Sequence, residues 1–287
     1  MGHHKKHLSL EKRNVTAGVL FLLPWIIGFI MFSLYPILMS LNLSFSELTD
    51  LVGAKTKFLG WANYSRAFVT DVKFMPMFLE IVKTTIVNTA LIIIFSLIAS
   101  LLLNTPIKGK GLFRGIFFFP MIIGTGVAMS WLRNAGMTQD VMSGLPITLL
   151  NYLGEDASII ITNVMNSLTN IVWKSSVQII LFISALQSIG DRLYEAAKVD
   201  GATAWQSLCK ITLPMVTPTL LVNIVFTIID SFTDTSNAMI DYIYNMAFVS
   251  SQYGYSAALG MFYFFFVLLV VGVVYWVMNR RTIYAGE

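Results

Sequence analysis

Apolar residues occur along this chain in long blocks separated by short polar stretches. A helix needs about 20 residues to cross a bilayer, and six blocks reach that length. These blocks cover residues 15–40, 80–104, 112–133, 158–188, 215–236 and 255–279. The pattern predicts an all-α membrane protein with six transmembrane helices in one domain, residues 15–279, between a basic tail (1–14) and a short tail (280–287).

Composition supports a membrane protein and argues against several enzyme classes. The chain is 56% hydrophobic and 12% charged, whereas soluble domains carry about 25% charged residues. The first block is too long for a cleaved signal peptide and no small-residue cleavage site follows it. No histidine occurs beyond His7, no Walker-type phosphate-binding loop is present, and Cys209 is the single cysteine. We therefore expect no Ser-His-Asp site, no metal site, no intrachain disulfide and no ATP hydrolysis by this chain.

The positions of Lys and Arg predict the orientation. With six spans both termini lie on one side, and most of the 19 basic residues fall on that side. They are Lys5, Lys6, Lys12, Arg13, Lys108, Lys110, Arg114, Arg192, Lys198, Lys210, Arg280 and Arg281. The positive-inside rule then places both termini and the loop at 191–214 in the cytoplasm.

The loop "EAAKVDGATAWQSLCKITLP" (195–214) is polar between two apolar blocks. The stretch from Asp191 to Lys198 favours a helix, and Gly201 marks the position where that helix ends or bends. A second short amphipathic piece follows, in which Trp205 suits the headgroup layer. Pro214 is expected to open the fifth span, because proline in a first turn costs little. An ordinary interfacial loop is the alternative.

The same stretch resembles the EAA loop of ABC importer permeases. The order is Glu-Ala-Ala, three residues, Gly, nine residues, then Ile-x-Leu-Pro. The resemblance implies a type I importer domain whose coupling helix docks into a cleft on a cytoplasmic ATPase subunit. The residues that it assigns to this coupling are Glu195, Ala196, Ala197, Asp200, Gly201, Ile211, Leu213 and Pro214.

Other segments resemble the carbohydrate-uptake subfamily of these permeases, the maltose, multiple-sugar and glycerol-phosphate type. They are Phe21–Phe45, Phe58–Phe68 with its Phe-x-Gly-x-x-Asn-Tyr pattern, Lys108–Pro120 and Leu186–Ala202. One segment departs from the pattern: Asp234–Tyr242 lacks the Gly-Gly-Pro that often follows the fifth span. The specific substrate of the best-known members is therefore not carried over.

The resemblance also implies partners. These are a second permease of similar fold, two ATPase subunits that bind ATP and Mg, and an extracytoplasmic solute-binding protein. No cofactor is expected in this chain. The complex would reside in the bacterial cell membrane and import a sugar or an oligosaccharide by alternating access.

Two polar stripes at helical spacing are candidates for the substrate path. One runs along the fourth span and contains Asn163, Asn166, Asn170, Lys174 and Gln178, with Trp173, Ser175 and Ser176 beside it. The other runs along the fifth span and contains Asn223, Thr227, Asp230 and Asp234. At 1.5 Å per residue, Trp173 and Asp230 both lie about 24 Å from the inner surface. An aromatic ring beside a carboxylate suits a sugar, which offers C–H faces and hydroxyls.

Each of these residues also has a structural interpretation. The stripes could join helices through hydrogen bonds, and Lys174 could pair with a carboxylate or extend to the interface. The run Phe262–Phe266 is expected to face lipid or to pack. Three other functions stay open: an ABC permease for a non-sugar solute, an ion-coupled transporter that uses Asp230 and Lys174, and a non-transporting scaffold.

Overall fold

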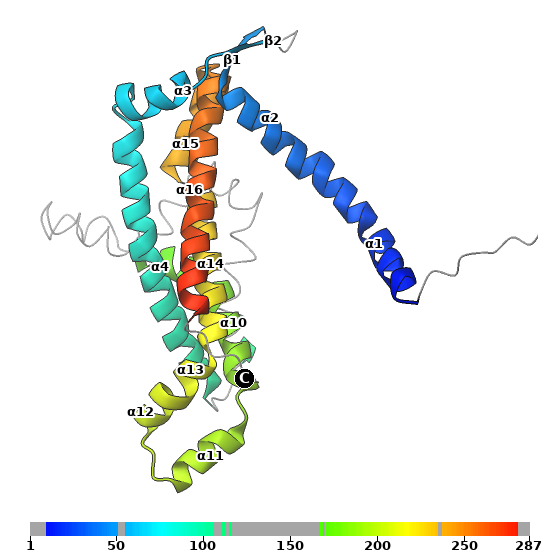
Figure 1. Cartoon of the computed structure of the whole chain (residues 1–287). Coiled ribbons are helices and arrows are strands. Elements are labelled where there is room, and N and C mark those ends of the chain that lie inside the picture. The colour runs from blue at the N-terminus through cyan, green and yellow to red at the C-terminus, as the bar shows by residue number, and fades with distance from the viewer. Residues whose placement is uncertain are drawn as a thin grey trace, which may run out of the picture. The chain divides into compact units, whose positions relative to one another are not determined.

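The computed structural model describes residues 10–50, 55–105, 111–112, 115, 167–168, 170–234 and 237–280 (Figure 1). These residues are mainly helical. The chain divides into two compact units by its contacts. The first combines residues 1–78 with 238–266, and the second combines residues 79–237 with 267–287.

The first unit begins with one long apolar helix in three parts. Helix α1 (Leu10–Phe29) continues through a π-helical turn (Ile30–Leu34) into α2 (Tyr35–Ser44). Pro36 falls in the first turn of α2, directly after the π-helical turn. Residues 18–44 are long and apolar enough to cross a membrane, and this helix covers most of the predicted first span at 15–40.

A β-hairpin follows, which the all-α prediction did not include. Strand β1 (Ser46–Asp50) pairs antiparallel with β2 (Lys55–Phe58) and places Glu47 opposite Lys57 and Asp50 opposite Lys55. Opposite charges across a strand pair favour the pairing. The strands are short and largely polar, and for this reason the search for apolar blocks did not find them.

The Phe-x-Gly-x-x-Asn-Tyr stretch ties this hairpin to the end of α2. Gly60 has a φ of +60°, a conformation that glycine adopts without strain, and α3 (Ala62–Ser65) begins two residues later. The buried Asn63 amide donates to the backbone oxygens of Ser44 and Ser46 at 3.0 and 3.1 Å. The Tyr64 hydroxyl donates to Ser44 Oγ at 2.8 Å. The stretch thus holds the hairpin against the end of α2.

The rest of the first unit packs around the start of α16 (Tyr253–Asn279). Its Phe262 ring contacts the rings of Phe68, Phe74 and Phe78 with centroid distances of 5.0 to 5.7 Å. The Phe262–Phe266 run, expected to face lipid or to pack, has residues of both kinds. Phe262 and Phe266 pack on aromatic rings, whereas Phe264 and Phe265 are exposed. Before α16, the segment predicted as a connection forms α15 (Ala238–Tyr244) and a π-helical turn (Asn245–Val249).

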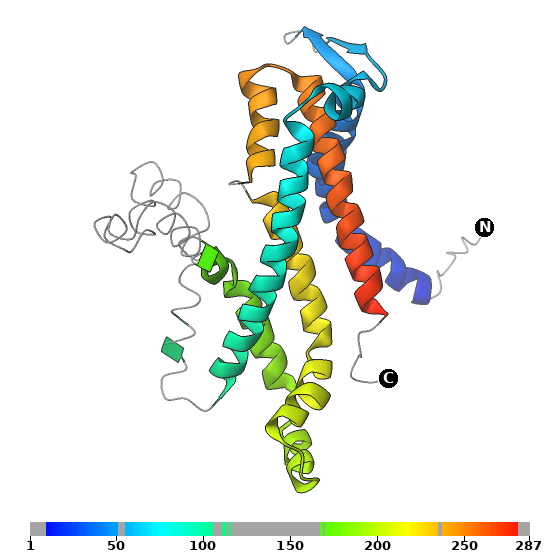
Figure 2. The same cartoon turned by 90° about the vertical axis from the view of Figure 1, so that its left-hand side faces the viewer.

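The second unit contains α10 (Ser176–Ser188), α14 (Thr217–Thr233) and most of α4 (Phe74–Asn104), seen together in Figure 2. One core cluster joins α4 to α10 through Ala99, Leu103, Ile179 and Ile183. A second cluster has Leu186, Ile189 and Val216 at its centre, with Leu97 and Leu101 of α4 packed on it.

The described residues contain three helices long and apolar enough to span a membrane, at 18–44, Phe74–Asn104 and Tyr253–Asn279. A fourth arises if Ala204–Met215 and Thr217–Thr233, which meet at a 64° bend, form one span. The predicted span at 112–133 and the first part of 158–188 lie mostly outside the described residues. Six spans therefore stay a prediction.

Candidate functional site

The polar loop begins with a capped helix, as its sequence predicted. Helix α11 (Asp191–Val199) has Asp191 in its first turn and Lys198 in its last turn, which suits the helix dipole. Gly201 has a φ of +78°. Its N–H bonds Lys198 O at 3.1 Å, and the Ala202 N–H bonds Ala197 O at 2.9 Å. This is the Schellman pattern, which closes a helix at a left-handed residue.

The second arm of the loop is a broken helix. Thr203 accepts the Gln206 N–H, and the Gln206 side chain accepts the Thr203 N–H, a capping box that starts α12 (Ala204–Ser207). A π-helical turn (Leu208–Thr212) and α13 (Leu213–Met215) follow, and the chain then bends by 64° into α14. Pro214 therefore does not open the long fifth helix as predicted. Pro218 takes that place, and Pro214 lies in the short turn before the bend.

A hydrogen bond joins the two arms. The hydroxyls of Tyr194 and Thr212 are 2.9 Å apart. Tyr194, Ile211 and Met215 also pack on the cluster of Leu186, Ile189 and Val216 at the ends of α10 and α14. Sequence reasoning missed Tyr194, although an aromatic residue inside an otherwise polar helix was a usable signal. The loop is thus packed against the ends of α10 and α14 through apolar contacts.

One side of α11 is exposed. Glu195, Ala196, Lys198, Val199 and Asp200 are exposed, and Val199 keeps 88% of its surface. Lys198 and Val199 were not in the predicted coupling set. Of that set, Glu195, Ala196, Asp200, Gly201 and Leu213 are exposed, and Ala197, Ile211 and Pro214 are partly buried. The predicted set therefore separates into a presented surface on α11 and a supporting group near the bend.

The two predicted polar stripes meet between α10 and α14. Gln178 Nε2 donates to Thr227 Oγ1 at 2.8 Å, Thr227 Oγ1 donates to Asn223 O at 2.7 Å, and Asn223 Nδ2 donates to Gln178 O at 3.3 Å. All three side chains are buried. In this structure they join the two helices, which is the structural interpretation of the stripes. Their place along a substrate path stays a prediction.

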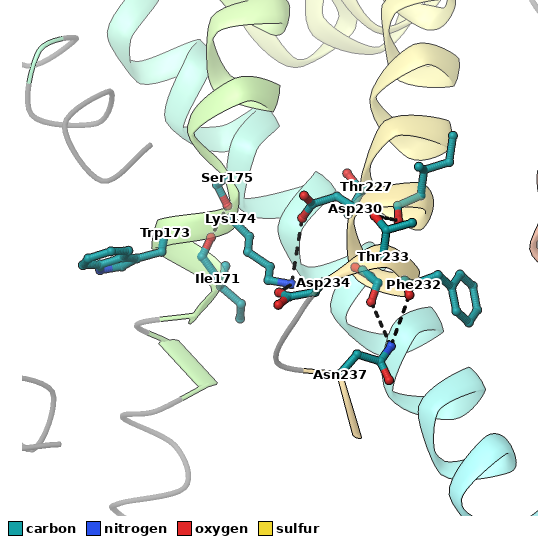
Figure 3. Close-up of polar contacts among 12 residues, drawn as sticks. Ile171, Trp173, Lys174, Ser175, Thr227, Asp230, Phe232, Thr233, Asp234 and Asn237 are labelled. Atoms are coloured by element: carbon teal, nitrogen blue, oxygen red, sulfur yellow. Dashed lines mark hydrogen bonds and ion pairs between the residues drawn. The ribbon is translucent and has the colours of Figure 1, made fainter. Parts of the chain in front are cut away.

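An ionic group lies further along the same two segments (Figure 3). Lys174 Nζ is 2.5 Å from Asp234 Oδ2 and 3.9 Å from Asp230 Oδ2. Charged side chains inside a membrane-spanning segment are costly unless they pair, so this contact explains how Lys174 is tolerated. The Asp230 side chain keeps 44% of its surface. It is the member of this group that a solute could reach.

The expected aromatic ring beside the carboxylates is not assembled. Figure 3 shows the Trp173 side chain directed away from Asp230 and Asp234. The backbone turns at Ser175, between the helical residues 170–174 and α10, so a single helical spacing does not carry through this point. Ser175 is buried and its hydroxyl donates to Ile171 O, and Asn170 is exposed. Asn163 and Asn166 lie outside the described residues.

The stretch that departs from Gly-Gly-Pro has its own contacts. Asn237 Nδ2 donates to Ser231 O at 3.2 Å and to Phe232 O at 3.5 Å, which satisfies carbonyls at the end of α14 (Figure 3). The last carbonyls of a helix need donors, and the Asn237 side chain supplies one here. The end of α14 is therefore hydrogen-bonded without a Gly-Gly-Pro stretch.

A polar cluster in the first unit was not predicted. Asp71 Oδ2 accepts the Tyr242 and Tyr255 hydroxyls at 2.6 and 2.5 Å. Asp71 Oδ1 accepts the backbone N–H groups of Lys73 and Phe74 at 2.9 and 3.1 Å. The aspartate before α4 was a detectable helix-start signal. The tyrosines, 171 and 184 residues away, were not detectable from one sequence.

The hydrogen bonds of this cluster set its protonation states. Burial raises the pKa of Asp71, but the hydrogen bonds from Tyr242, Tyr255 and the two N–H groups outweigh burial and leave this pKa below its ordinary value. Burial, together with the hydrogen bond to the Asp71 carboxylate, raises the pKa of Tyr242 to about 12. The cluster thus holds an ionised Asp71 against neutral tyrosines at neutral pH.

Known proteins are similar to this chain in sequence or in fold. YesP of Bacillus subtilis, a probable ABC transporter permease protein, is 30% identical over 98% of this chain and 94% of its own length. MsmF of Streptococcus mutans, a multiple sugar-binding transport system permease protein, is 30% identical over 91% of this chain and 93% of its own length. A solved chain of a bacterial alginate ABC transporter, crystallised in complex with an alginate pentasaccharide-bound periplasmic protein, has a TM-score of 0.69 and 21% identity. That similarity covers 96% of this chain and 99% of the solved one.

Residues 92–282, about two thirds of the chain, match one family. The match includes α10, the loop from α11 to α13, and α14. It also includes the ionic group of Lys174, Asp230 and Asp234. The chain belongs to the family of binding-protein-dependent transport system inner membrane components.

Proposed function

We propose that this protein is the membrane-spanning permease subunit of a bacterial ABC importer that moves a sugar or an oligosaccharide. A second permease of similar fold would complete the path, and an extracytoplasmic binding protein would deliver the cargo. The family and the multiple-sugar permease among the relatives support this proposal. The observation that carries it is the loop, in which α11 presents an exposed face while its other side is attached to α10 and α14.

The loop geometry suits the transmission of force. A partner that displaces α11 also displaces Tyr194, which is bonded to Thr212 and packed on Leu186, Ile189 and Val216. Those residues lie at the ends of α10 and α14, and the interhelical layer of Gln178, Asn223 and Thr227 connects the same two helices. Movement of α11 is therefore delivered to the segments that carry Lys174, Asp230 and Asp234.

ATP chemistry is assigned to a partner. ATP and Mg would be bound by two ATPase subunits, whose closure pushes the coupling helices of the two permeases together. The cargo would then pass by alternating access. This chain would need no cofactor of its own.

The proposed orientation places α11, α12 and both termini in the cytoplasm, on the distribution of Lys and Arg. The single cysteine, Cys209, is partly exposed within this loop and provides a test. We expect a membrane-permeant thiol reagent to label Cys209 in intact cells and an impermeant reagent to fail. Strong labelling by the impermeant reagent would reverse the orientation.

Uptake into proteoliposomes tests the function. The complex is reconstituted with its ATPases, its binding protein and internal ATP, and uptake of a labelled oligosaccharide is measured. We expect uptake to need ATP and binding protein and to persist when ionophores collapse ion gradients. Loss of uptake with ionophores would favour the ion-coupled alternative that uses Lys174 and Asp230. ATP-dependent uptake of a non-sugar solute in place of the oligosaccharide would keep the class and change the cargo.

A further inference from the structure

The first unit fixes one basic side chain in a defined orientation. The guanidinium carbon of Arg66 lies 4.1 Å from the centroid of the Tyr255 ring. The Tyr255 hydroxyl is bonded to Asp71, which also holds Tyr242 and caps the start of α4. Three separate segments therefore hold the ring on which Arg66 rests. The long arginine side chain is ordered before any partner arrives.

Stacking leaves the hydrogen-bonding edge of the guanidinium available. An arginine that rests on an aromatic face can still direct its N–H groups outward in a planar fork that matches a carboxylate. Arg66 is exposed, and it makes no ion pair with any described residue. Asp71 makes no ion pair with Arg66, and its two oxygens accept the two tyrosine hydroxyls and two backbone N–H groups.

The same turn offers a second cation and exposed apolar surface. Lys73 is exposed and makes no ion pair within the described part of the chain. Val69 and Val72 are almost fully exposed between the two cations. On the neighbouring hairpin, Lys57 is also exposed and lies opposite Glu47 in the strand register. The turn from Arg66 to Lys73, which we name the outer turn, thus presents two exposed cations beside two exposed valines, while the Asp71 carboxylate is bonded to the tyrosines.

We propose that the outer turn is a docking surface for an acidic patch on the extracytoplasmic binding protein. This inference rests on the proposed function and on the proposed orientation, which puts residues 66–73 outside the cell. Interfaces between proteins commonly place apolar contacts beside arginine, and complementary charge speeds and orients such encounters. The two exposed valines would give a protein surface its apolar contact, and the test below separates this occupant from a lipid headgroup.

The test uses the complete transporter in vesicles of neutral lipid. The solute-binding protein that co-purifies with the complex is titrated in, and the concentration for half-maximal ATPase stimulation is measured. We expect Arg66→Gln and Lys73→Gln each to raise that concentration roughly five-fold, the effect of one lost charge-assisted contact. Both variants should keep the maximal rate and show weaker dependence on salt. Lys73 lies outside the stack on Tyr255, so Lys73→Gln keeps the test decisive if Arg66→Gln does not assemble.

Lys57→Gln is the matched control, because it removes one exposed positive charge from the neighbouring hairpin. We expect its half-maximal concentration to equal that of the unaltered complex. An unchanged value for both outer-turn variants would overturn the inference. So would a shift that appears only in vesicles with anionic lipid, since the outer turn would then bind a headgroup. If the binding protein fails to stimulate even the unaltered complex, the proposed function itself fails, and this inference with it.

Discussion

The hydroxyl of Tyr194 lies 2.9 Å from the hydroxyl of Thr212, and this contact closes the loop between α11 and the bend before α14. Tyr194→Phe keeps the ring in the apolar cluster but removes the bond. A single hydrogen bond contributes about 1 kcal/mol, so we expect the complex to assemble with a looser loop. Fewer sugar molecules should then be imported per ATP hydrolysed.

That ratio is measured in proteoliposomes from parallel uptake and phosphate-release assays. Tyr275→Phe is the control, because Tyr275 is exposed on α16. An unchanged ratio in Tyr194→Phe would show that the bond does not contribute to coupling.

Gly201 closes α11 with a φ of +78°. A residue with a side chain pays about 1–2 kcal/mol in this region, and a β-branched one pays more. The penalty is conformational, because no neighbouring atom lies within 4 Å of an added Cβ. We expect Gly201→Val to leave the protein inserted, to weaken co-purification of the ATPase and to abolish uptake. Charge reversal in Glu195→Lys should have the same result on the exposed face.

Gly190 supplies the control for this change. It precedes α11 with a φ of −66°, and an added Cβ would also meet open space. Gly190→Val should retain most ATPase binding. Equal losses in both valine variants would mean that bulk in the loop, and not the left-handed backbone, causes the effect.

Asp230 is the accessible carboxylate of the ionic group, so Asp230→Ala should impair uptake while ATPase activity and assembly persist. One lost hydrogen bond to a sugar hydroxyl costs about 1 kcal/mol, roughly five-fold in affinity. Trp173→Ala should have the smaller effect, because its ring is directed away from Asp230. Phe264→Ala on exposed surface serves as the control. Normal uptake by Asp230→Ala would leave the group as a helix-joining contact only.

The Asp71 cluster predicts a pH-dependent difference in stability. Its folded-state pKa is lowered, so its contribution is present above the ordinary value of 3.8 and is lost as pH falls through the lowered value. Asp71→Asn should therefore have a lower Tm than the unaltered protein at pH 7. As pH falls through the lowered pKa of Asp71, the two Tm values should converge, because the carboxyl of the unaltered folded protein is then protonated too.

The measurement is thermal unfolding of the purified protein across that pH range. Asp241→Asn, a change at an exposed aspartate on α15, is the control and should not alter Tm at either pH. A Tm difference for Asp71→Asn that stays constant down to the lowest pH would argue against ionic stabilisation by Asp71.

Gly254 permits the start of α16 to lie against β1. A Cβ at this position would overlap the backbone carbonyl of Ser46, which cannot rotate away as a side chain could. Gly254→Ala should destabilise the protein by about 1–3 kcal/mol, as overpacking does. Gly272→Ala, in the same helix with open space around it, should be neutral or stabilising, because alanine favours helix over glycine. The readout is Tm, and equal values for both variants would contradict the close approach.

The sequence predicted the features that depend on residues close together along the chain, such as helices and their ends. Apolar runs located α4 and α16, and Gly201 located the end of α11. The hairpin was not predicted because its strands are short and largely polar, with Glu47 opposite Lys57, and carry no apolar run. Trp173 was misplaced because Ser175 interrupts the helix whose spacing was assumed. The tyrosines bound to Asp71 depend on contacts across more than half of the chain, which no periodicity encodes.

The π-helical turn at Leu208–Thr212 carries a consequence for chain length. A π turn holds one residue more than an α turn, so this turn absorbs one extra position between the capping box at Thr203 and the bend after Met215. Deleting a single residue there would allow a regular α-helix and leave the later side chains on their present sides, because the π turn already holds the extra residue. One further residue inserted without a second π turn would instead rotate every later side chain by about 100°, and Met215 would leave the cluster at the ends of α10 and α14. The stretch between Thr203 and the bend should therefore tolerate the loss of one residue better than the gain of one.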